Sequence, residues 1–437
     1  MCPSVASTHG DIPQRTEGNT SARRGSLRCA AKTLYICYFG LREPLVQTQV
    51  LPYLRQLVAG GIEVTLLTFE PGELPQGEVD KWRSRLAQQD LRWLSLRYHK
   101  KPSLPATLYD IAAGVRLAVR LVREEGIAVV HARSHVPAAM AALTKKLSAC
   151  RMVFDIRGFF PEEYVDAGVW PAGGLLYRLT KRAERTLLAS SDACIVLTNR
   201  AREIVRSSPW VSAHVPIEVI PCCVDLQRFA EVNGCREVMR KQLGVQGRRV
   251  IVYVGAMGGW YLSEQMADFL AVAHRLNPST FALIVSQSSS SEVVGRLATR
   301  GLGQGDFLVV TVAPEQVPRY LAAADLAFCF IKPSYSKVSS SPTKIAEYLA
   351  AGLPVICNSG IGDVDDVLSR DRVGVLLRDF TTEAYAAAIK AVETLRQEPG
   401  FAERCRAVAR ARFDLCGVGG PRYRSVYQAL VAAGGAV

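Results

Sequence analysis

The sequence predicts an α/β protein with two doubly wound parallel sheets, each in its own domain. Short apolar runs alternate with helical patterns along most of the chain, which is typical of strands joined by crossover helices. This alternation pauses near 210–225 and starts again at 249. The 437 residues, of which 49% are hydrophobic, are sufficient for two globular cores.

The first half carries seven apolar runs that we interpret as buried strands. The first of them, 33–39, is followed by a helical pattern that ends at the glycine pair 60–61. The predicted strands are 33–39, 63–69, 92–97, 127–132, 151–156, 193–198 and 217–220, and the clearest helices are 46–59, 108–124, 135–148 and 173–190.

The second half repeats this pattern and ends in a helix at about 417–433. Its predicted strands are 249–254, 281–285, 307–312, 325–331, 353–357 and 373–377. We therefore expect a first domain at 31–215, a second domain at 216–400, and C-terminal helices at 401–437 that pack back towards the first domain.

Residues 1–30 are polar and lack the apolar core of a signal peptide. We expect a disordered leader, or a start codon assigned too far upstream. No run approaches the roughly 18 apolar residues of a membrane-spanning helix. The twelve cysteines are dispersed without a Cys-x-x-Cys pair, which favours a reducing cytoplasm over a disulfide framework.

The formal net charge of +13 favours acidic partners such as nucleotide-sugars or anionic lipid. Nucleic acid is not expected, because no zinc-finger or RNA-recognition signature occurs. Helix 173–190 carries four basic residues among leucines, so it could contact the inner membrane face, although a solvated basic face is the simpler interpretation. These residues are Arg178, Lys181, Arg182 and Arg185.

The segment 325–357 reads as a strand, a serine-rich loop, a helix and another strand. Pro342 suits the first turn of that helix, Ser341 its N-cap and Gly352 its C-cap. The start of a helix offers free N–H groups and a positive dipole end, which suit a phosphate. Lys344 and Glu347 could then contact the phosphate and the ribose of one nucleotide, unless they only solvate an ordinary capped helix.

The run Ser-Pro-Thr-Lys-Ile-Ala-Glu at 341–347, followed by Ala-Gly and Pro-Val, resembles the donor-binding segment of retaining GT-B glycosyltransferases of family four. That family usually has two glutamates separated by seven residues. The second maps to Glu347, which in the family holds the ribose, whereas the first falls on Ser339. The resemblance implies two Rossmann-like domains facing a central cleft and a hexosyltransferase-type enzyme.

The resemblance also implies which residues bind the donor. The loop with Gly255, Gly258 and Gly259 follows the first strand of the second domain, where glycine lets the backbone approach a diphosphate. The family usually has an Arg and a Lys near this loop, and this chain has neither, so Lys344 is expected to supply the cation. The remaining expected donor contacts are Ser339, Ser340, Ser341 and Thr343.

Polar residues also follow two strands of the first domain, at the edge where ligands bind in such sheets. We expect them to face the cleft as catalytic candidates, or to form a structural ion pair around Asp155. Gln47 and Gln49 are candidates for binding sugar or acceptor hydroxyls. The catalytic candidates are His131, Arg133, Asp155, Arg157 and Glu162.

No metal or other cofactor is expected, since the acidic run Asp363, Asp365 and Asp366 fits a helix start better than a metal site. The predicted reaction moves a sugar from a nucleotide-sugar to a hydroxyl of a glycan, polysaccharide or lipid-linked acceptor. Two alternatives remain open: a sugar-nucleotide epimerase, which would turn over without an acceptor, and a non-catalytic nucleotide-sugar-binding subunit.

Overall fold

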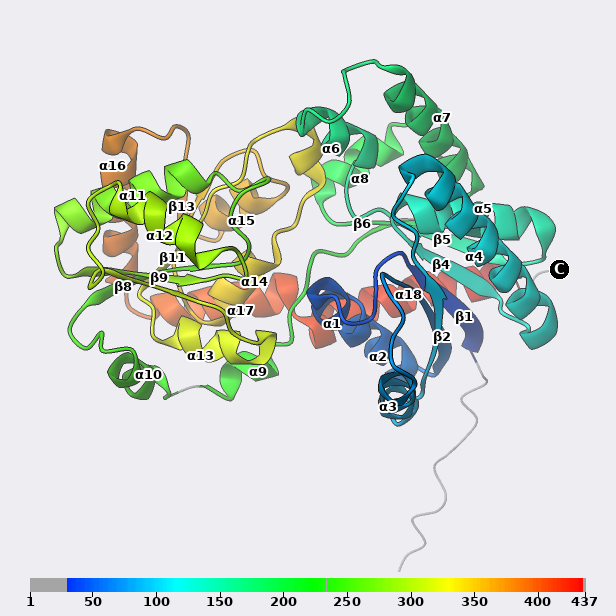
Figure 1. The fold of residues 1–437 in the computed structure, drawn as a ribbon, viewed down its shortest axis with the longest axis horizontal. Coiled ribbons are helices and arrows are strands. Elements are labelled where there is room, and N and C mark those ends of the chain that lie inside the picture. The colour runs from blue at the N-terminus through cyan, green and yellow to red at the C-terminus, as the bar shows by residue number, and fades with distance from the viewer. Residues whose placement is uncertain (1–29, 233, 435–437) are drawn as a thin grey trace, which may run out of the picture.

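The computed structural model describes residues 30–232 and 234–434, which form two α/β domains lying side by side (Figure 1). The leader predicted at 1–30 lies outside the described residues, apart from Ala30, where the first strand begins. The prediction of two parallel-sheet domains is confirmed.

The first domain contains a parallel seven-stranded sheet in the order β3-β2-β1-β4-β5-β6-β7. The chain moves outward from β1 in one direction and then from β4 in the other, so the sheet is doubly wound. The strands are β1 (Ala30–Cys37), β2 (Ile62–Glu70), β3 (Leu91–Arg97), β4 (Val129–Arg133), β5 (Arg151–Asp155), β6 (Ala193–Val196) and β7 (Ile217–Val219).

The second domain contains a parallel six-stranded sheet in the order β10-β9-β8-β11-β12-β13. Its winding direction changes between β8 and β11, which is the position where ligands bind in sheets of this kind. The strands are β8 (Arg249–Val254), β9 (Thr280–Val285), β10 (Phe307–Val310), β11 (Leu326–Cys329), β12 (Val355–Asn358) and β13 (Gly374–Leu377).

Helices cover both faces of each sheet (Figure 1). In the first domain they are α1 (Pro44–Gln49), α2 (Leu51–Ala59), α3 (Gln76–Ala87), α4 (Ser103–Glu125), α5 (His135–Leu147), α6 (Phe160–Asp166), α7 (Leu175–Ser190) and α8 (Asn199–Arg206). They continue with α9 (Gln227–Ala230), α10 (Arg236–Gln242), α11 (Ser263–Leu276), α12 (Ser290–Ala298), α13 (Val317–Ala322), α14 (Thr343–Ala350), α15 (Val364–Arg370), α16 (Thr382–Arg396), α17 (Phe401–Phe413) and α18 (Gly420–Gly434). Three short turns are η1 (Pro314–Gln316), η2 (Tyr335–Ser339) and η3 (Leu415–Gly419).

The helix predicted at 46–59 is two helices, α1 and α2, which meet at Val50. The break has a local cause, because Pro52 has no N–H to donate to the carbonyl of Thr48. Val50 leaves the helical region with φ −120° and ψ −66°. The helix predicted at 417–433 likewise begins with the single wide turn η3 before α18.

The last two helices pack in different domains. Phe401, Cys405 and Phe413 of α17 belong to the core of the second domain. In α18, by contrast, Tyr423 and Tyr427 are buried in a core cluster with strands of the first domain. In Figure 1, α18 lies beside β1, so the chain closes the first domain only at its C-terminal end.

Candidate functional site

Helix α14 begins with an open N-terminus at the carboxyl end of the second sheet. Pro342 is the N-cap residue and has no side-chain cap. Among the described residues, the N–H groups of Thr343 and Lys344 have no hydrogen-bond acceptor. Such a helix start can receive an anion. Ser341, expected to be the N-cap, instead accepts a hydrogen bond from the N–H of Cys222 at 3.1 Å.

Lys344 is buried, with 7% of its surface exposed. Its Nζ donates to the hydroxyl of Tyr253 at 2.9 Å and lies 3.7 Å from the ring centroid of Tyr261. Within the described chain it forms no ion pair with a carboxylate. A buried ammonium group is costly unless it is paired, and aromatic faces compensate only part of that cost. The positive charge of Lys344 is therefore not fully compensated by the protein, and binding of an external anion would compensate it.

Gly255, in the loop after β8, has no side chain and so leaves space for the ammonium group of Lys344. Its φ is +125°, and a Cβ at this position would lie 2.8 Å from Nζ of Lys344. The N–H of Gly258 is already engaged by Ser263 Oγ at 2.7 Å. Gly258 and Gly259 both have positive φ and shape the turn. The structure thus ties Gly255 to Lys344, a contact that the spacing of the glycines did not indicate.

Glu347 lies one turn along α14 from Lys344 and is partly buried. Burial raises the pKa of its carboxyl to about 7, although Arg228 and Lys344 act in the opposite direction. The group is therefore close to its midpoint between the neutral and charged forms at neutral pH. In either form its oxygens can hydrogen-bond to hydroxyl groups.

The serine loop before α14 contacts the first domain. Ser339, 1% exposed, donates to the carbonyl of Ser336 at 2.7 Å and accepts from the N–H of Phe159 at 3.2 Å. Ser340 lies at the wall of the inter-domain cavity described below. The Ser339 hydroxyl thus donates within the turn and accepts from the first domain, whereas the Ser341 hydroxyl accepts from Cys222 and keeps its own O–H as a donor.

In the first domain, Asp155 at the end of β5 is the centre of a buried charged cluster. Its carboxylate accepts from the Tyr423 hydroxyl at 2.9 Å and from Arg157 at 3.3 Å. Arg133 approaches it to 3.6 Å. Burial alone would raise the pKa of Asp155, but Arg157, His131 and Arg133 hold it well below its usual range. The carboxylate is the counterion of two buried guanidinium groups.

His131 is fully buried, in contrast to the expectation that it faces the cleft. Its ring stacks on Tyr35 at 4.4 Å between centroids, and Nδ1 is 2.9 Å from the Tyr427 hydroxyl. Burial lowers the pKa of the imidazole, which is therefore neutral. Tyr427 lies 296 residues further along the chain, so no local sequence pattern around His131 could indicate that α18 buries this side chain.

The other predicted residues of the first domain also have internal partners. Glu162 lies on α6 and pairs with Lys181 of α7 at 2.9 Å. Gln47 donates to the carbonyl of Leu41 at 2.6 Å, and Gln49 donates to that of Cys223 at 3.2 Å. The structure therefore brings His131, Arg133 and Arg157 around Asp155, whereas Glu162 pairs with Lys181.

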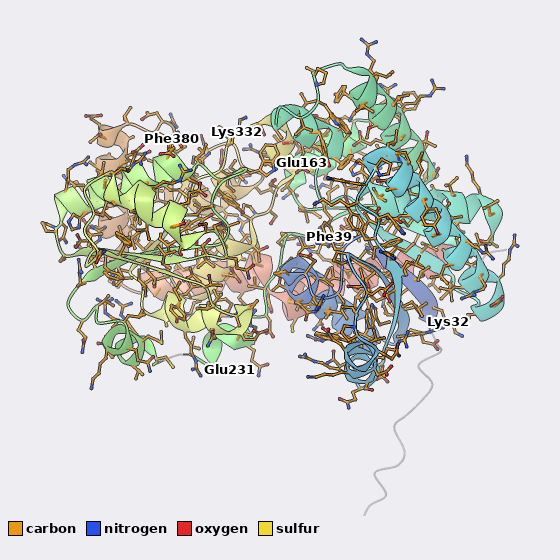
Figure 2. The ribbon with its side chains drawn as sticks, viewed as in Figure 1. Lys32, Phe39, Glu163, Glu231, Lys332 and Phe380 are labelled. Atoms are coloured by element: carbon orange, nitrogen blue, oxygen red, sulfur yellow. The ribbon has the colours of Figure 1, made fainter. Side chains whose placement is uncertain are left out.

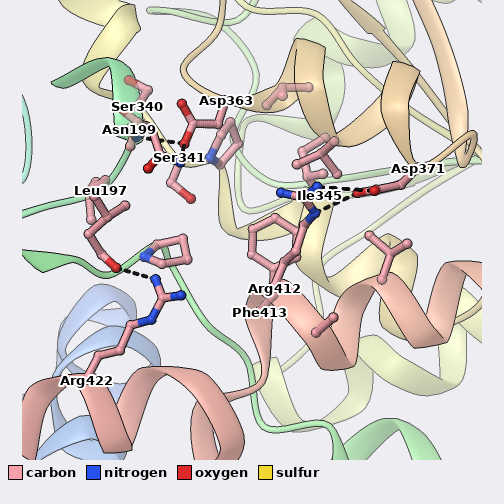
Figure 3. Close-up of a pocket in the computed structure, with 18 of the residues that line it drawn as sticks. Leu197, Asn199, Ser340, Ser341, Ile345, Asp363, Asp371, Arg412, Phe413 and Arg422 are labelled. Carbon is pink, nitrogen blue, oxygen red and sulfur yellow. Dashed lines mark hydrogen bonds and ion pairs between the residues drawn. The ribbon is translucent and has the colours of Figure 1, made fainter. Parts of the chain in front are cut away.

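A cavity of about 570 Å³ lies between the two domains, beside the start of α14 and along α17. Figure 3 shows residues that line it. Its charged residues have partners. Arg412 pairs with Asp371, and Asp363 accepts from the N–H of Asn199 at 2.7 Å. Arg404 and Arg422 pair with Glu398 and Glu218. Asp363 thus joins the two domains, which accounts for part of the acidic run considered as a metal site. Across the described ranges, no cluster of three or more potential metal ligands occurs.

Several residues of the site carried no sequence signal. Tyr253 and Tyr261, which hold Lys344, read as part of a strand and of a loop. Arg228, whose charge acts on Glu347, lies in a short helix far from α14 in sequence. The glycines between Tyr253 and Tyr261 indicated an approach of this loop to a diphosphate, but not its contact with Lys344.

Together, the winding change between β8 and β11, the open start of α14 and the buried Lys344 define an α/β protein of two domains with a site suited to an anionic ligand. Comparison with known proteins gives the family. Residues 46–228 match the model of Glycosyltransferase Family 4, and residues 248–394 match that of Glycosyl transferases group 1. The chain belongs to the glycosyltransferase family that these two models describe.

Two curated relatives are similar over part of the chain. Spore coat protein SA of Bacillus subtilis (strain 168) is 24% identical over 222 residues, which cover 47% of this chain and 56% of the relative. The GDP-mannose-dependent alpha-(1-6)-phosphatidylinositol monomannoside mannosyltransferase of Mycolicibacterium smegmatis is 24% identical over 275 residues, covering 62% and 68%. The alignment thus spans about half to two thirds of these relatives.

Among solved structures, Anabaena HepE in complex with UDP and glucose superposes with a TM-score of 0.66 at 15% identity. The match covers 93% of this chain and all of that one. At this identity the similarity establishes the fold, which is the expected GT-B fold.

Proposed function

We propose that the chain transfers a sugar from a nucleotide-sugar to a hydroxyl group of a glycan, polysaccharide or lipid-linked acceptor, with retention of configuration. The buried Lys344, which has tyrosine partners but no carboxylate partner within the described chain and lies at the open start of α14, carries this proposal. The Anabaena structure with UDP and the GDP-mannose-dependent relative support a nucleotide-sugar donor.

The residues around α14 would act mainly on the leaving group. When the bond between the sugar and the diphosphate breaks, negative charge grows on the departing nucleoside diphosphate. Nζ of Lys344 and the free N–H groups of Thr343 and Lys344 would stabilise that charge in place, with little reorganisation. Glu347 would hold the ribose hydroxyls. The acceptor would approach from the first domain, near Arg157.

A binding screen tests this proposal. UDP, GDP, UDP-glucose and GDP-mannose are each added to the chain, and the midpoint of thermal unfolding is measured. A ligand at about 100 times its Kd should stabilise the folded state by about 2.7 kcal/mol. At least one nucleotide should raise the midpoint in the wild type and much less in Lys344→Ala. No shift with any of the four, or equal shifts in the variant, would contradict the proposal.

Product analysis then separates the alternatives. Transfer that depends on an added acceptor supports a glycosyltransferase. Sugar isomerisation without acceptor would indicate an epimerase, and binding without turnover a non-catalytic subunit.

We also propose that the reaction needs no metal, because Lys344 and α14 supply positive charge. A chelator should then leave most of the rate, and activity restored only by a divalent ion would contradict this.

We further propose a cytoplasmic protein that contacts the inner membrane face through α7. This helix exposes Leu175, Leu176 and Leu179 together with Arg178 and Arg182. Apolar and basic side chains on one exposed helix suit a surface of anionic lipid. No helix of the described residues is long and apolar enough to cross a membrane.

A further inference from the structure

Lys337, in the turn η2 before α14, contacts both domains with one side chain. It is 5% exposed, and its Nζ lies 3.1 Å from Oε1 of Glu163 on α6 of the first domain. The same Nζ is 3.8 Å from the ring centroid of Trp260, which belongs to the loop after β8 of the second domain. One ammonium group thus connects α6 with the loop that also holds Lys344.

Further contacts fix α6 against the same turn. Both ends of α6 take part: the N–H of Phe159 donates to Ser339 Oγ at 3.2 Å, and the N–H of Ser336 donates to Asp166 at 2.9 Å. Lys332 donates to the carbonyl of Asp166 at 3.0 Å. Figure 2 labels Lys332 and Glu163, which lie on facing segments of the two domains.

These contacts lead directly to the proposed donor site. The segment that carries Lys337 continues through 338–342 into α14, whose first turn holds the free N–H groups of Thr343 and Lys344. Trp260 is the neighbour of Tyr261, on whose ring Lys344 rests. A shift of α6 relative to the second domain would therefore act on both walls of the phosphate site.

We propose that Lys337 and Glu163 are positioning residues: their ion pair transmits the docking of the first domain to the phosphate site formed by α14 and the loop 255–261. The ammonium of Lys337 is already occupied by Glu163 and the Trp260 ring, so it acts through these neighbours and not by contact with the donor. This inference rests on the proposed function for its catalytic consequence, but not for its structural one.

The structural consequence can be measured without any ligand, by hydrogen-exchange mass spectrometry. Lys337→Met removes the positive charge of the ion pair. Glu163→Gln removes the negative charge and keeps a polar side chain. Both variants should raise the rate of hydrogen exchange in 255–261 and in 343–350 by about tenfold or more, because these segments lose the contact that fixes them against α6. Lys337→Arg, which keeps a cation beside Glu163 and the Trp260 ring, should raise exchange less than Lys337→Met.

The catalytic consequence is measured with whichever of UDP-glucose or GDP-mannose raises the unfolding midpoint. Misplacement of a site by about 1 Å can cost about 100-fold in rate, so kcat should fall about 10- to 100-fold while the donor KM changes little. Asp366→Asn, which breaks an exposed ion pair with Arg370 in the same domain, is the matched control and should leave both parameters unchanged.

The two proposals fail differently. Unchanged exchange in both segments in folded Lys337→Met and Glu163→Gln would overturn the positioning role, as would an increase in Lys337→Arg as large as that in Lys337→Met. If Lys337→Met does not fold, Glu163→Gln decides, since Glu163 is partly exposed. Faster exchange in a chain that binds neither nucleotide-sugar would instead overturn the proposed function and leave the structural coupling in place.

Discussion

Lys344 and Glu347 lie one turn apart on α14, and their replacement should change different kinetic parameters. Loss of the Lys344 ammonium removes a charge that matters most as the leaving group becomes negative, so Lys344→Ala should lower kcat by about 30- to 1000-fold, or about 2–4 kcal/mol. Glu347→Gln should act mainly on donor KM, because ribose contacts change little during the reaction. Steady-state kinetics on both folded variants would show this difference. Wild-type kinetics in both would place the donor elsewhere.

The shifted pKa of Glu347 predicts a pH dependence of stability. Burial raises this pKa from 4.5 to about 7, so between these values the folded state holds a proton that the unfolded chain releases. The stabilising effect of that proton is complete below pH 4.5 and is lost as the pH rises to about 7, up to about 3 kcal/mol. Glu347→Gln should flatten this part of the profile in urea titrations. A variant profile parallel to that of the wild type would disprove the assignment.

Asp155 predicts a large loss of stability of a different kind. Asp155→Asn would leave Arg133 and Arg157 buried without their carboxylate. Breaking a buried ion pair from one side costs about 3–5 kcal/mol, which urea denaturation would detect. The exposed pair of Arg370 and Asp366 provides the comparison, since Asp366→Asn should cost under about 1 kcal/mol. Equal effects of the two variants would mean that the Asp155 cluster is not structurally important.

At the scale of elements, α7 predicts selective binding to anionic lipid. Leu175 and Leu179 are 73% and 54% exposed, and Arg178 and Arg182 share the exposed side. In sedimentation with vesicles, the chain should bind mixtures of phosphatidylcholine and phosphatidylglycerol but not phosphatidylcholine alone. Reversal of two basic charges, Arg178→Glu with Arg182→Glu, should weaken binding about tenfold or more, at about 1 kcal/mol per charge.

The control for α7 is Leu276→Gln. Leu276 is similarly exposed, at 55%, but lies on α11 of the second domain. It should leave vesicle binding unchanged, whereas Leu175→Gln with Leu179→Gln should reduce it. If all three variants bind like the wild type, α7 is only a solvated basic face, as the sequence alone also allowed.

Elements also show what the sequence could predict. The apolar runs at 249–254 and 33–39 gave strands close to β8 and β1, because parallel strands are buried on both faces. The short helix α6 was not predicted, since its residues 160–166 look like polar and aromatic residues at the end of a strand. Its position depends on contacts with η2 from the other domain, which no local pattern records.

The same limit applied to the candidate site. Lys344 and Glu347 could be proposed from the sequence because their signal is local: a serine loop, Pro342 and a helix pattern in sequence order. His131 was expected in the cleft because it lies near the carboxyl end of a strand, where ligands bind in parallel sheets. This expectation assumes that no other element covers that end of the sheet. Burial of His131 depends on α18, which packs there from the far end of the chain.

At the scale of the whole molecule, the first domain is completed only when the chain returns from the second. Tyr423 and Tyr427 of α18 are almost fully buried, together with Val426 and Leu430, in a cluster that includes Tyr35 and Tyr53. Burial of each large apolar side chain contributes about 1.5–3 kcal/mol. Loss of four such side chains is comparable with the total stability of a domain, about 5–15 kcal/mol.

A chain that ends at Gly419 should therefore lose the folded first domain, although every strand of its sheet is still present. Removal of α18 would also take away the hydroxyls that bond to Asp155 and His131, leaving polar groups that were buried beneath the helix without these partners. Limited proteolysis with peptide mass spectrometry should show rapid cleavage within 30–215, while a chain ending at Gly434 resists. If residues 30–215 of the shortened chain remain as resistant as in the full chain, α18 is an addition to a domain that is stable without it.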